Sequence, residues 1–152
     1  MARYYSRKVI DPYQDYQYEI YDHISNNDQK FLSVATKLAF TSDNRFRIGA
    51  IVVKSRRVLG GSANITRQSP STPPNRFSTH AEIAASRVAS STDKATLYVA
   101  RLSSKDQTAM ARPCSWCMQK ITEAGIDKVV YTTGVDTAES FYTSTIKWSR
   151  YA

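Results

Sequence analysis

Three residues with the chemistry of zinc ligands stand out in this sequence, and a carboxylate lies close to the first of them. His80 is followed two positions later by Glu82, and Cys114 and Cys117 form a Cys-x-x-Cys pair after Pro113. Structural zinc sites close with four protein ligands, whereas catalytic sites keep three and leave one position for water. The sequence has no other cysteine, so the count stops at three. Bound Zn²⁺ lowers the pKa of water to about 7, and a neighbouring carboxylate can then move protons.

Each half of this pattern alone also fits other chemistry. A Cys-x-x-Cys pair occurs in thioredoxin-like redox proteins, a His-x-Glu run is common on helix surfaces, and a structural zinc knuckle is a further alternative. Together, in this order and with proline before the first cysteine, the residues resemble the signature of the zinc-dependent nucleobase deaminases. That superfamily holds the cytidine, deoxycytidylate and transfer-RNA adenosine deaminases.

The resemblance covers roughly residues 28–147 and implies a role for each motif residue. His80, Cys114 and Cys117 occupy the positions that bind one zinc ion, and Glu82 occupies the position of the proton shuttle. The backbone N–H of Ala81 would hold the exocyclic or carbonyl group of the base. A histidine as the first ligand is typical of the deoxycytidylate and adenosine enzymes.

Three further residues are candidates for substrate binding. Phe46 begins a run similar to the first strand of cytidine deaminases, where the aromatic ring lies against the base; the alternative is a core residue. Asn64 resembles the asparagine of an Asn-Ile-Glu run that holds the ribose, although Thr66 replaces the glutamate, and a turn residue is the alternative. Arg67 is the candidate for a substrate phosphate, or is simply exposed.

Length and composition favour one domain. A chain of 152 residues can bury a sizeable core, and we expect a single deaminase domain over 1–152, with a tyrosine-rich extension at 1–26 and a core at 27–148. No apolar run is long enough to span a membrane, and the first residues lack the apolar core of a signal peptide. Both cysteines belong to the metal motif, which favours the reducing cytoplasm.

Charge and aromatic residues leave two kinds of partner open. The net charge is +8, and residues 43–76 hold seven basic residues against one acidic residue. Such a segment attracts a phosphate-bearing substrate, either a nucleotide or a nucleic acid; the alternative is a solvated basic face. The tyrosines of the extension could stack on bases or cover a core edge or subunit contact. His23 has no ligand spacing around it and is expected to be structural or exposed.

Periodicity predicts the elements that must position these residues. We expect helices from Asn27 as N-cap to about 40–42, from Thr79 as N-cap through Val88, and from Cys114 to Glu123 with Gly125 as the stop. Two helix N-termini would then face the metal. The expected strands are 48–53, 58–63, 95–102, 128–133 and 141–148, and the glycine pair in the second of them weakens it or marks a bulge.

The connection before the last strand is too short for a crossover helix, so this strand should run antiparallel to its neighbour. The expected fold is α/β, a three-layer cytidine-deaminase-like fold with a mixed five-stranded sheet and helices on both faces. An antiparallel last strand is the arrangement of the nucleoside cytidine deaminases.

The leading hypothesis is the hydrolytic deamination of a cytosine nucleotide or nucleoside, of CMP or dCMP type, to the uracil product with release of ammonia. A deaminase acting on cytosine or adenine in single-stranded nucleic acid or transfer RNA is the alternative enzyme, and a non-catalytic zinc-stabilised binding module is the alternative from another class. Related enzymes are commonly oligomers, so a homo-oligomer is expected.

Overall fold

The computed structural model describes residues 6–11, 16–66 and 78–148. In chain order the elements are β1 (Ser6–Asp11), β2 (Tyr16–Tyr21), α1 (Asn26–Ala39), β3 (Arg47–Lys54), β4 (Arg57–Ala63), β5 (Ile65–Thr66), β6 (Ser78–Thr79), α2 (Ala81–Val88), β7 (Thr96–Leu102), β8 (Thr108–Ala109), α3 (Ser115–Glu123), β9 (Lys128–Gly134), β10 (Thr137–Tyr142), the 3₁₀ turn η1 (Thr143–Thr145) and β11 (Lys147–Trp148). No helix in these ranges is both long and apolar enough to cross a bilayer.

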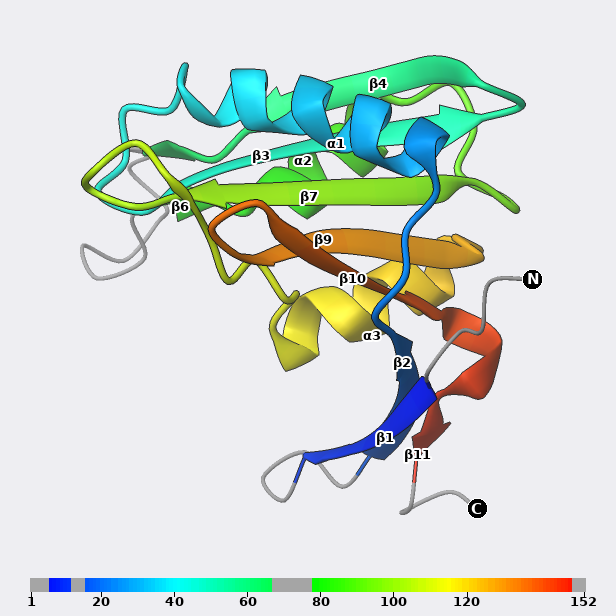
Figure 1. Ribbon diagram of the computed structural model, residues 1–152. Coiled ribbons are helices and arrows are strands. Elements are labelled where there is room, and N and C mark those ends of the chain that lie inside the picture. The colour runs from blue at the N-terminus through cyan, green and yellow to red at the C-terminus, as the bar shows by residue number, and fades with distance from the viewer. Residues whose placement is uncertain (1–5, 12–15, 67–77, 149–152) are drawn as a thin grey trace.

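A mixed sheet in the order β1-β2-β10-β9-β7-β3-β4 forms the middle layer (Figure 1). Strands β7 and β9 run parallel, and the other pairs along this path are antiparallel. The expected α/β class is confirmed, but the sheet has more than five strands. The tyrosine-rich N-terminal segment supplies β1 and β2, because Tyr16, Tyr18 and Ile20 alternate with polar residues and turn inward to pack with Phe141.

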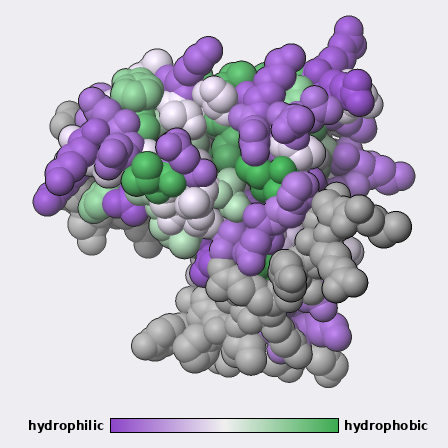
Figure 2. Space-filling model, in the orientation of Figure 1, coloured by the Kyte–Doolittle hydropathy of each residue, from purple (hydrophilic) through white to green (hydrophobic). Residues whose placement is uncertain are grey.

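Helices cover both faces of this sheet, as expected (Figure 1). In β7, Leu97 and Val99 pack into a core that also holds residues of α2 and α3, whereas Tyr98 and Ala100 pack into a second core against α1. Successive side chains of a strand point to opposite faces, so the near-continuous apolar run of β7 reflects burial on both sides. The face that carries α1 is mostly hydrophilic on its outer surface (Figure 2).

The last expected strand has the predicted direction but the wrong bounds. Strand β10 pairs antiparallel with β9, with Glu139 opposite Tyr131. It begins at Thr137, not at 141, because a tight turn with Asp136 in the left-handed region (φ 55°) reverses the chain directly after β9. The chain then passes through η1, and Trp148 belongs to β11, which pairs with β2.

Two predicted helix caps are also wrong. Helix α1 is capped by Ser25, not Asn27: the Ser25 hydroxyl accepts from the Asp28 N–H, and the Asp28 carboxylate accepts from the Ser25 N–H. This capping box satisfies two backbone donors at once, which a lone Asn27 would not do. Helix α2 has His80 as its N-cap in place of Thr79, and no side chain caps it.

Asp28 also ties α1 to the sheet. Its buried carboxylate accepts hydrogen bonds from the Tyr98 hydroxyl at 2.8 Å and from the Lys128 ammonium at 3.0 Å. Burial alone would raise the pKa of Asp28, but these two hydrogen bonds, the positive charge of Lys128 and the Ser25 N–H together outweigh burial and hold the pKa below its ordinary value. The ionised form of Asp28 is therefore the one that stabilises the fold.

Replacing Asp28 with asparagine should destabilise the protein by about 2–3 kcal/mol at neutral pH, since hydrogen bonds to a buried charge are lost. A carboxyl group whose pKa is lower in the folded state stabilises the folded protein at pH values above its unfolded-state pKa. This stabilisation disappears as the pH falls through the folded-state pKa. The free energy of unfolding in urea should therefore differ between wild type and Asp28→Asn, and this difference should shrink below about pH 4. The exposed Asp127→Asn variant serves as the control and should stay within about 0.5 kcal/mol of wild type at each pH. A difference in unfolding free energy that does not change with pH would show that the Asp28 charge is not the source of the stabilisation.

Candidate active site

Three side chains from two helix N-termini converge on one point behind the sheet. His80 is the N-cap of α2, Cys114 is the N-cap of α3, and Cys117 lies in the first turn of α3. Their ligand atoms all lie within 4.8 Å of one another, and within the described part of the chain no further ligand-type residue joins the group. The His80 Nδ1 atom is 3.2 Å from Cys117 Sγ and 3.8 Å from Cys114 Sγ. Tetrahedral zinc separates such atoms by roughly 3.5 Å, so the group fits the ion.

The protonation of the two thiols fits a metal site as well. Hydrogen bonds from Cys117 and His80 lower the pKa of Cys114 to about 4, so Cys114 is a thiolate at neutral pH. The hydrogen bond to Cys114 and burial raise the pKa of Cys117, and the hydrogen bond to Cys114 raises that of His80. Two thiols and one imidazole thus share protons that a metal ion would displace.

Glu82 lies in the first turn of α2, immediately beside this group. It is only 4% exposed, and its Oε1 atom has no hydrogen-bond partner. Burial raises the pKa of Glu82 above its ordinary value, and the carboxyl group lies against the Cys117 thiol. A buried acid with a free oxygen is costly for stability and is suited to taking up and releasing a proton.

Close packing holds α2 in this position. A Cβ atom added to Gly60 of β4 would lie 2.7 Å from the Ala89 backbone just after α2, so only glycine allows this approach. The strand has a bulge beside the glycine pair, as expected: Val52 pairs with Gly60 and Val53 pairs with Val58, so Leu59 is left out of the pairing. The C-terminal end of α2 is fixed at this level of the sheet. Its N-terminus, about 12 Å away at 1.5 Å per residue, reaches toward the opposite end of β3 and β7.

Helix α3 is held by a polar network at its start and a glycine at its end. Arg112, two residues before Cys114, donates to the Tyr131 hydroxyl at 3.3 Å and to Glu139 at 3.4 Å. The Tyr131 hydroxyl donates to the same carboxylate at 2.8 Å. Gly125 follows the helix with φ 80°, the left-handed conformation predicted for its stop.

Asn64 connects the cysteine–histidine group to the start of β3. The residue after it pairs with Thr79, which precedes His80, through the small β5–β6 ladder. The buried Asn64 side chain accepts from the Ile48 N–H at 2.8 Å and donates to the Phe46 carbonyl. The Asn64 amide therefore positions the backbone that carries Phe46. Through the β5–β6 ladder it is also connected to the segment that leads into His80.

The other predicted residues differ in how far the structure locates them. Phe46 is 54% exposed, so it is not a core residue. Ala81 is fully buried at the start of α2, next to Glu82. Trp116 is half exposed and meets the His80 ring edge-on at 5.6 Å, so it borders the group. Arg67 lies outside the described residues.

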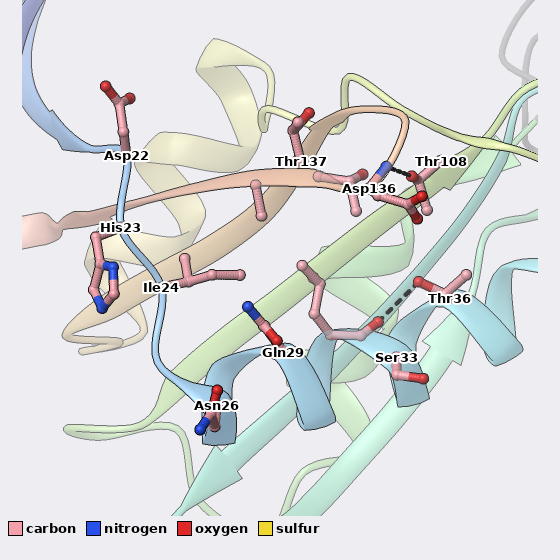
Figure 3. Close-up of a pocket in the computed structure, with 13 residues that line it drawn as sticks. Asp22, His23, Ile24, Asn26, Gln29, Ser33, Thr36, Thr108, Asp136 and Thr137 are labelled. Atoms are coloured by element: carbon pink, nitrogen blue, oxygen red, sulfur yellow. Dashed lines mark hydrogen bonds between the residues drawn. The ribbon is translucent and has the colours of Figure 1, made fainter.

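An open polar hollow of about 710 Å³ lies on the other face of the sheet, beside α1 (Figure 3). Asp22, His23 and Asn26 line one side and Asp136 and Thr137 of the β9–β10 hairpin line another. The exposed position of His23 agrees with the sequence expectation. Because the His80 group faces the opposite core, this hollow is separate from it.

Comparison with known proteins gives the family. The family described as "Cytidine and deoxycytidylate deaminase zinc-binding region" matches residues 25–133, which contain the whole cysteine–histidine group. The chain belongs to this family. Membership identifies it as a hydrolytic deaminase and argues against a binding module without turnover.

Relatives of this deaminase agree with the assignment. Deoxycytidylate deaminase of Mycobacterium phage D29 is 34% identical over 128 residues, 68% of this chain and 92% of that protein. The dCMP deaminase of cyanophage S-TIM5 is 27% identical, with a TM-score of 0.57 over 75% of this chain and 88% of that one. Its structure in complex with dCMP and dUMP gives 25% identity and a TM-score of 0.55 over 73% and 85%. Cytidine deaminase from Burkholderia pseudomallei, 17% identical, shares the fold with a TM-score of 0.61 over 80% and 94%.

Sequence reasoning missed two arginines of this deaminase near the group. Arg112 precedes the proline of the cysteine motif, but its partners Tyr131 and Glu139 are close only in the folded sheet. Arg101 interrupts the apolar run of β7. A cation in a strand that is otherwise buried on both faces was the available signal, since such a residue needs a partner.

Proposed function

We propose that this chain is a zinc-dependent deaminase that converts a cytosine nucleotide of CMP or dCMP type into the uracil nucleotide, with release of ammonia. The observation that carries the proposal is a buried Glu82 with a free oxygen beside a His–Cys–Cys group. Support for the base and the nucleotide comes from relatives named as deoxycytidylate deaminases, one of them in complex with dCMP and dUMP.

His80 Nδ1 and the sulfur atoms of Cys114 and Cys117 would hold one zinc ion. Bound there, zinc would supply a water molecule acidic enough to serve as the nucleophile near neutral pH. Glu82 would accept the proton that the nucleophile gives up and pass it to N3 of the cytosine ring. It would then take the proton of the hydroxyl group newly bonded to C4 and deliver it to the departing amine. Burial raises the pKa of this carboxyl group above its ordinary value, which makes it a better proton acceptor than an exposed glutamate.

Four residues are proposed to hold the substrate. The backbone N–H of Ala81, at the start of α2, would bind the exocyclic or carbonyl group of the base. The exposed ring of Phe46 would lie against the base, Asn64 would approach the sugar, and Arg67 would attract the phosphate. The Asn64 oxygen accepts from the Ile48 N–H and the Ser42 hydroxyl, and one amide hydrogen donates to the Phe46 carbonyl, so the second amide hydrogen is the atom that a sugar would meet.

A nucleic-acid substrate receives less support. Among the tyrosines of the N-terminal segment, Tyr16 and Tyr18 are at most 4% exposed and belong to the core, where they cannot stack on bases. This supports the alternative in which they cover a core edge.

We further infer a single domain and a homo-oligomer. We also infer a cytoplasmic location, since both thiols must stay reduced to bind the metal.

A substrate screen tests the proposed function. Purified protein would be offered cytidine, deoxycytidine, CMP, dCMP, dCTP, adenosine nucleotides and single-stranded oligonucleotides, with ammonia and base product measured. We expect turnover of a cytosine monophosphate with the highest kcat/KM, formation of the uracil nucleotide, and none with adenine. Turnover confined to oligonucleotides or to adenine would overturn the proposal.

A further inference from the structure

Arg101 is a partly buried cation with no anionic partner among the residues that the structure describes. Its Nε atom is buried and has no hydrogen-bond partner, and no described carboxylate forms an ion pair with it. Its neighbours differ: Arg47 pairs with Asp106 at 2.6 Å and Arg112 with Glu139 at 3.4 Å. An unsatisfied buried donor costs free energy, and such a group in a folded protein calls for an explanation such as a ligand.

The strand pattern places Arg101 on the same face of the sheet as the cysteine–histidine group. Leu97 and Val99 of β7 face the core that contains Cys117. Arg101 follows them at the same period of two, so its side chain projects from this face. It lies at the C-terminal end of β7, the end toward which the N-terminus of α2 reaches.

Backbone pairing brings Arg101 close to His80. Arg101 pairs with Ile48 of β3, and the Ile48 N–H donates to the Asn64 side chain. The β5 strand that follows Asn64 pairs with β6, the strand that leads directly into His80. From the other side, the Arg101 N–H donates to Thr132, whose carbonyl accepts from the N–H of the residue before Arg112. Arg101 thus lies between the two segments that carry the metal ligands.

Phe46 supports the Arg101 side chain from outside. The guanidinium carbon lies 5.1 Å from the centre of the Phe46 ring, and the Arg45 guanidinium lies 5.9 Å from the same ring. Hydrogen bonds with Asn44 and Asn64 fix the Phe46 backbone on both sides, so an exposed aromatic ring is held in place. A guanidinium stacked on a ring keeps its in-plane N–H donors free, and their fork matches phosphate oxygens.

We propose that Arg101, supported by Phe46, binds the 5′-phosphate of a mononucleotide substrate. The inference rests on the proposed function and adds to it the group that distinguishes a nucleotide from a nucleoside. The phosphate would accept from the Arg101 Nε–H and from a terminal N–H, which satisfies the buried donor and neutralises the unpaired cation.

Steady-state kinetics of Arg101→Gln with dCMP and with deoxycytidine test the inference. We expect kcat/KM for dCMP to fall about 10- to 100-fold, mainly through KM, because a charge-assisted pair of hydrogen bonds is lost. For deoxycytidine, kcat/KM should stay within about 3-fold, which also shows that the variant is folded. The matched control Arg57→Gln removes an exposed cation at the far end of β4 and should change neither value. Arg101→Lys keeps the charge without the fork, so its loss for dCMP should be smaller.

Calorimetry would measure the affinities of wild type and Arg101→Gln for dUMP and for deoxyuridine. This compares nucleotide with nucleoside without turnover, and so separates this inference from the proposed function. If wild type deaminates neither dCMP nor deoxycytidine but Arg101→Gln weakens dUMP binding selectively, the proposed function fails and the inference stands. If wild type deaminates dCMP and Arg101→Gln affects both substrates equally or not at all, the inference is overturned. A single-stranded oligonucleotide tests the other source of phosphate: an affinity loss confined to it would also overturn the inference.

Discussion

Cys117→Ser is expected to leave the purified protein without zinc and without measurable deaminase activity. The Cys117 sulfur lies 3.2 Å from His80 Nδ1 and is fully buried, so a serine hydroxyl there would be a poor, largely protonated ligand. Loss of a residue that merely orients a ligand typically weakens metal binding 10–100-fold. Loss of a ligand itself should therefore exceed about 100-fold. Elemental analysis after gel filtration would measure zinc per chain.

A variant inside the same motif controls for local disturbance. Ser115 lies between the two cysteines at the start of α3 and is not part of the metal-ligand group. Ser115→Ala should retain one zinc per chain and most of the activity. Cys117→Ser protein that keeps one tightly bound zinc ion would show that the ion lies elsewhere, and the assignment of all three ligands would then fail.

The metal-ligand group could be predicted from the sequence because its geometry is local. Cys114 and Cys117 meet through one helical turn, and a helix N-terminus at each motif follows from nearby residues. Only the contact between His80 and Cys117 joins residues that are far apart in the sequence. That contact could be predicted because the three residues together form a recognisable set of zinc ligands. The strands β3, β4, β7 and β9 were predictable for a similar reason, since each is an apolar run bounded by turn residues.

The rest of the fold depends on pairing that spacing does not encode. The inward alternation of Tyr16, Tyr18 and Ile20 is visible in the sequence, but their partner Phe141 lies more than a hundred residues later. The start of β10 depends on the left-handed conformation of Asp136, a residue type that tolerates it without requiring it. Arg101 and Phe46 meet only because β7 pairs with β3 in one particular register.

Glu82→Gln should lower kcat by at least about 10⁴-fold while zinc content and dUMP affinity change little. A positioned general acid–base typically contributes about 10²–10⁴-fold, and Glu82 would carry out several proton transfers in one cycle. Glutamine has nearly the same shape but cannot accept and release the proton. The exposed Glu123→Gln, the same chemical change at the end of α3, is the matched control and should keep wild-type kcat.

Thermal unfolding of Glu82→Gln separates a catalytic from a structural carboxylate. Glu82 is buried and leaves Oε1 without a partner, and burial raises its pKa, so on balance the fold disfavours its charge. Glutamine removes the cost of burying an ionisable group, and the Tm of Glu82→Gln should equal or exceed that of wild type. A residue kept for stability would give the reverse, with a lower Tm and preserved turnover. A Glu82→Gln enzyme that deaminates at near wild-type rate would overturn the proposed mechanism whichever nucleotide is the substrate.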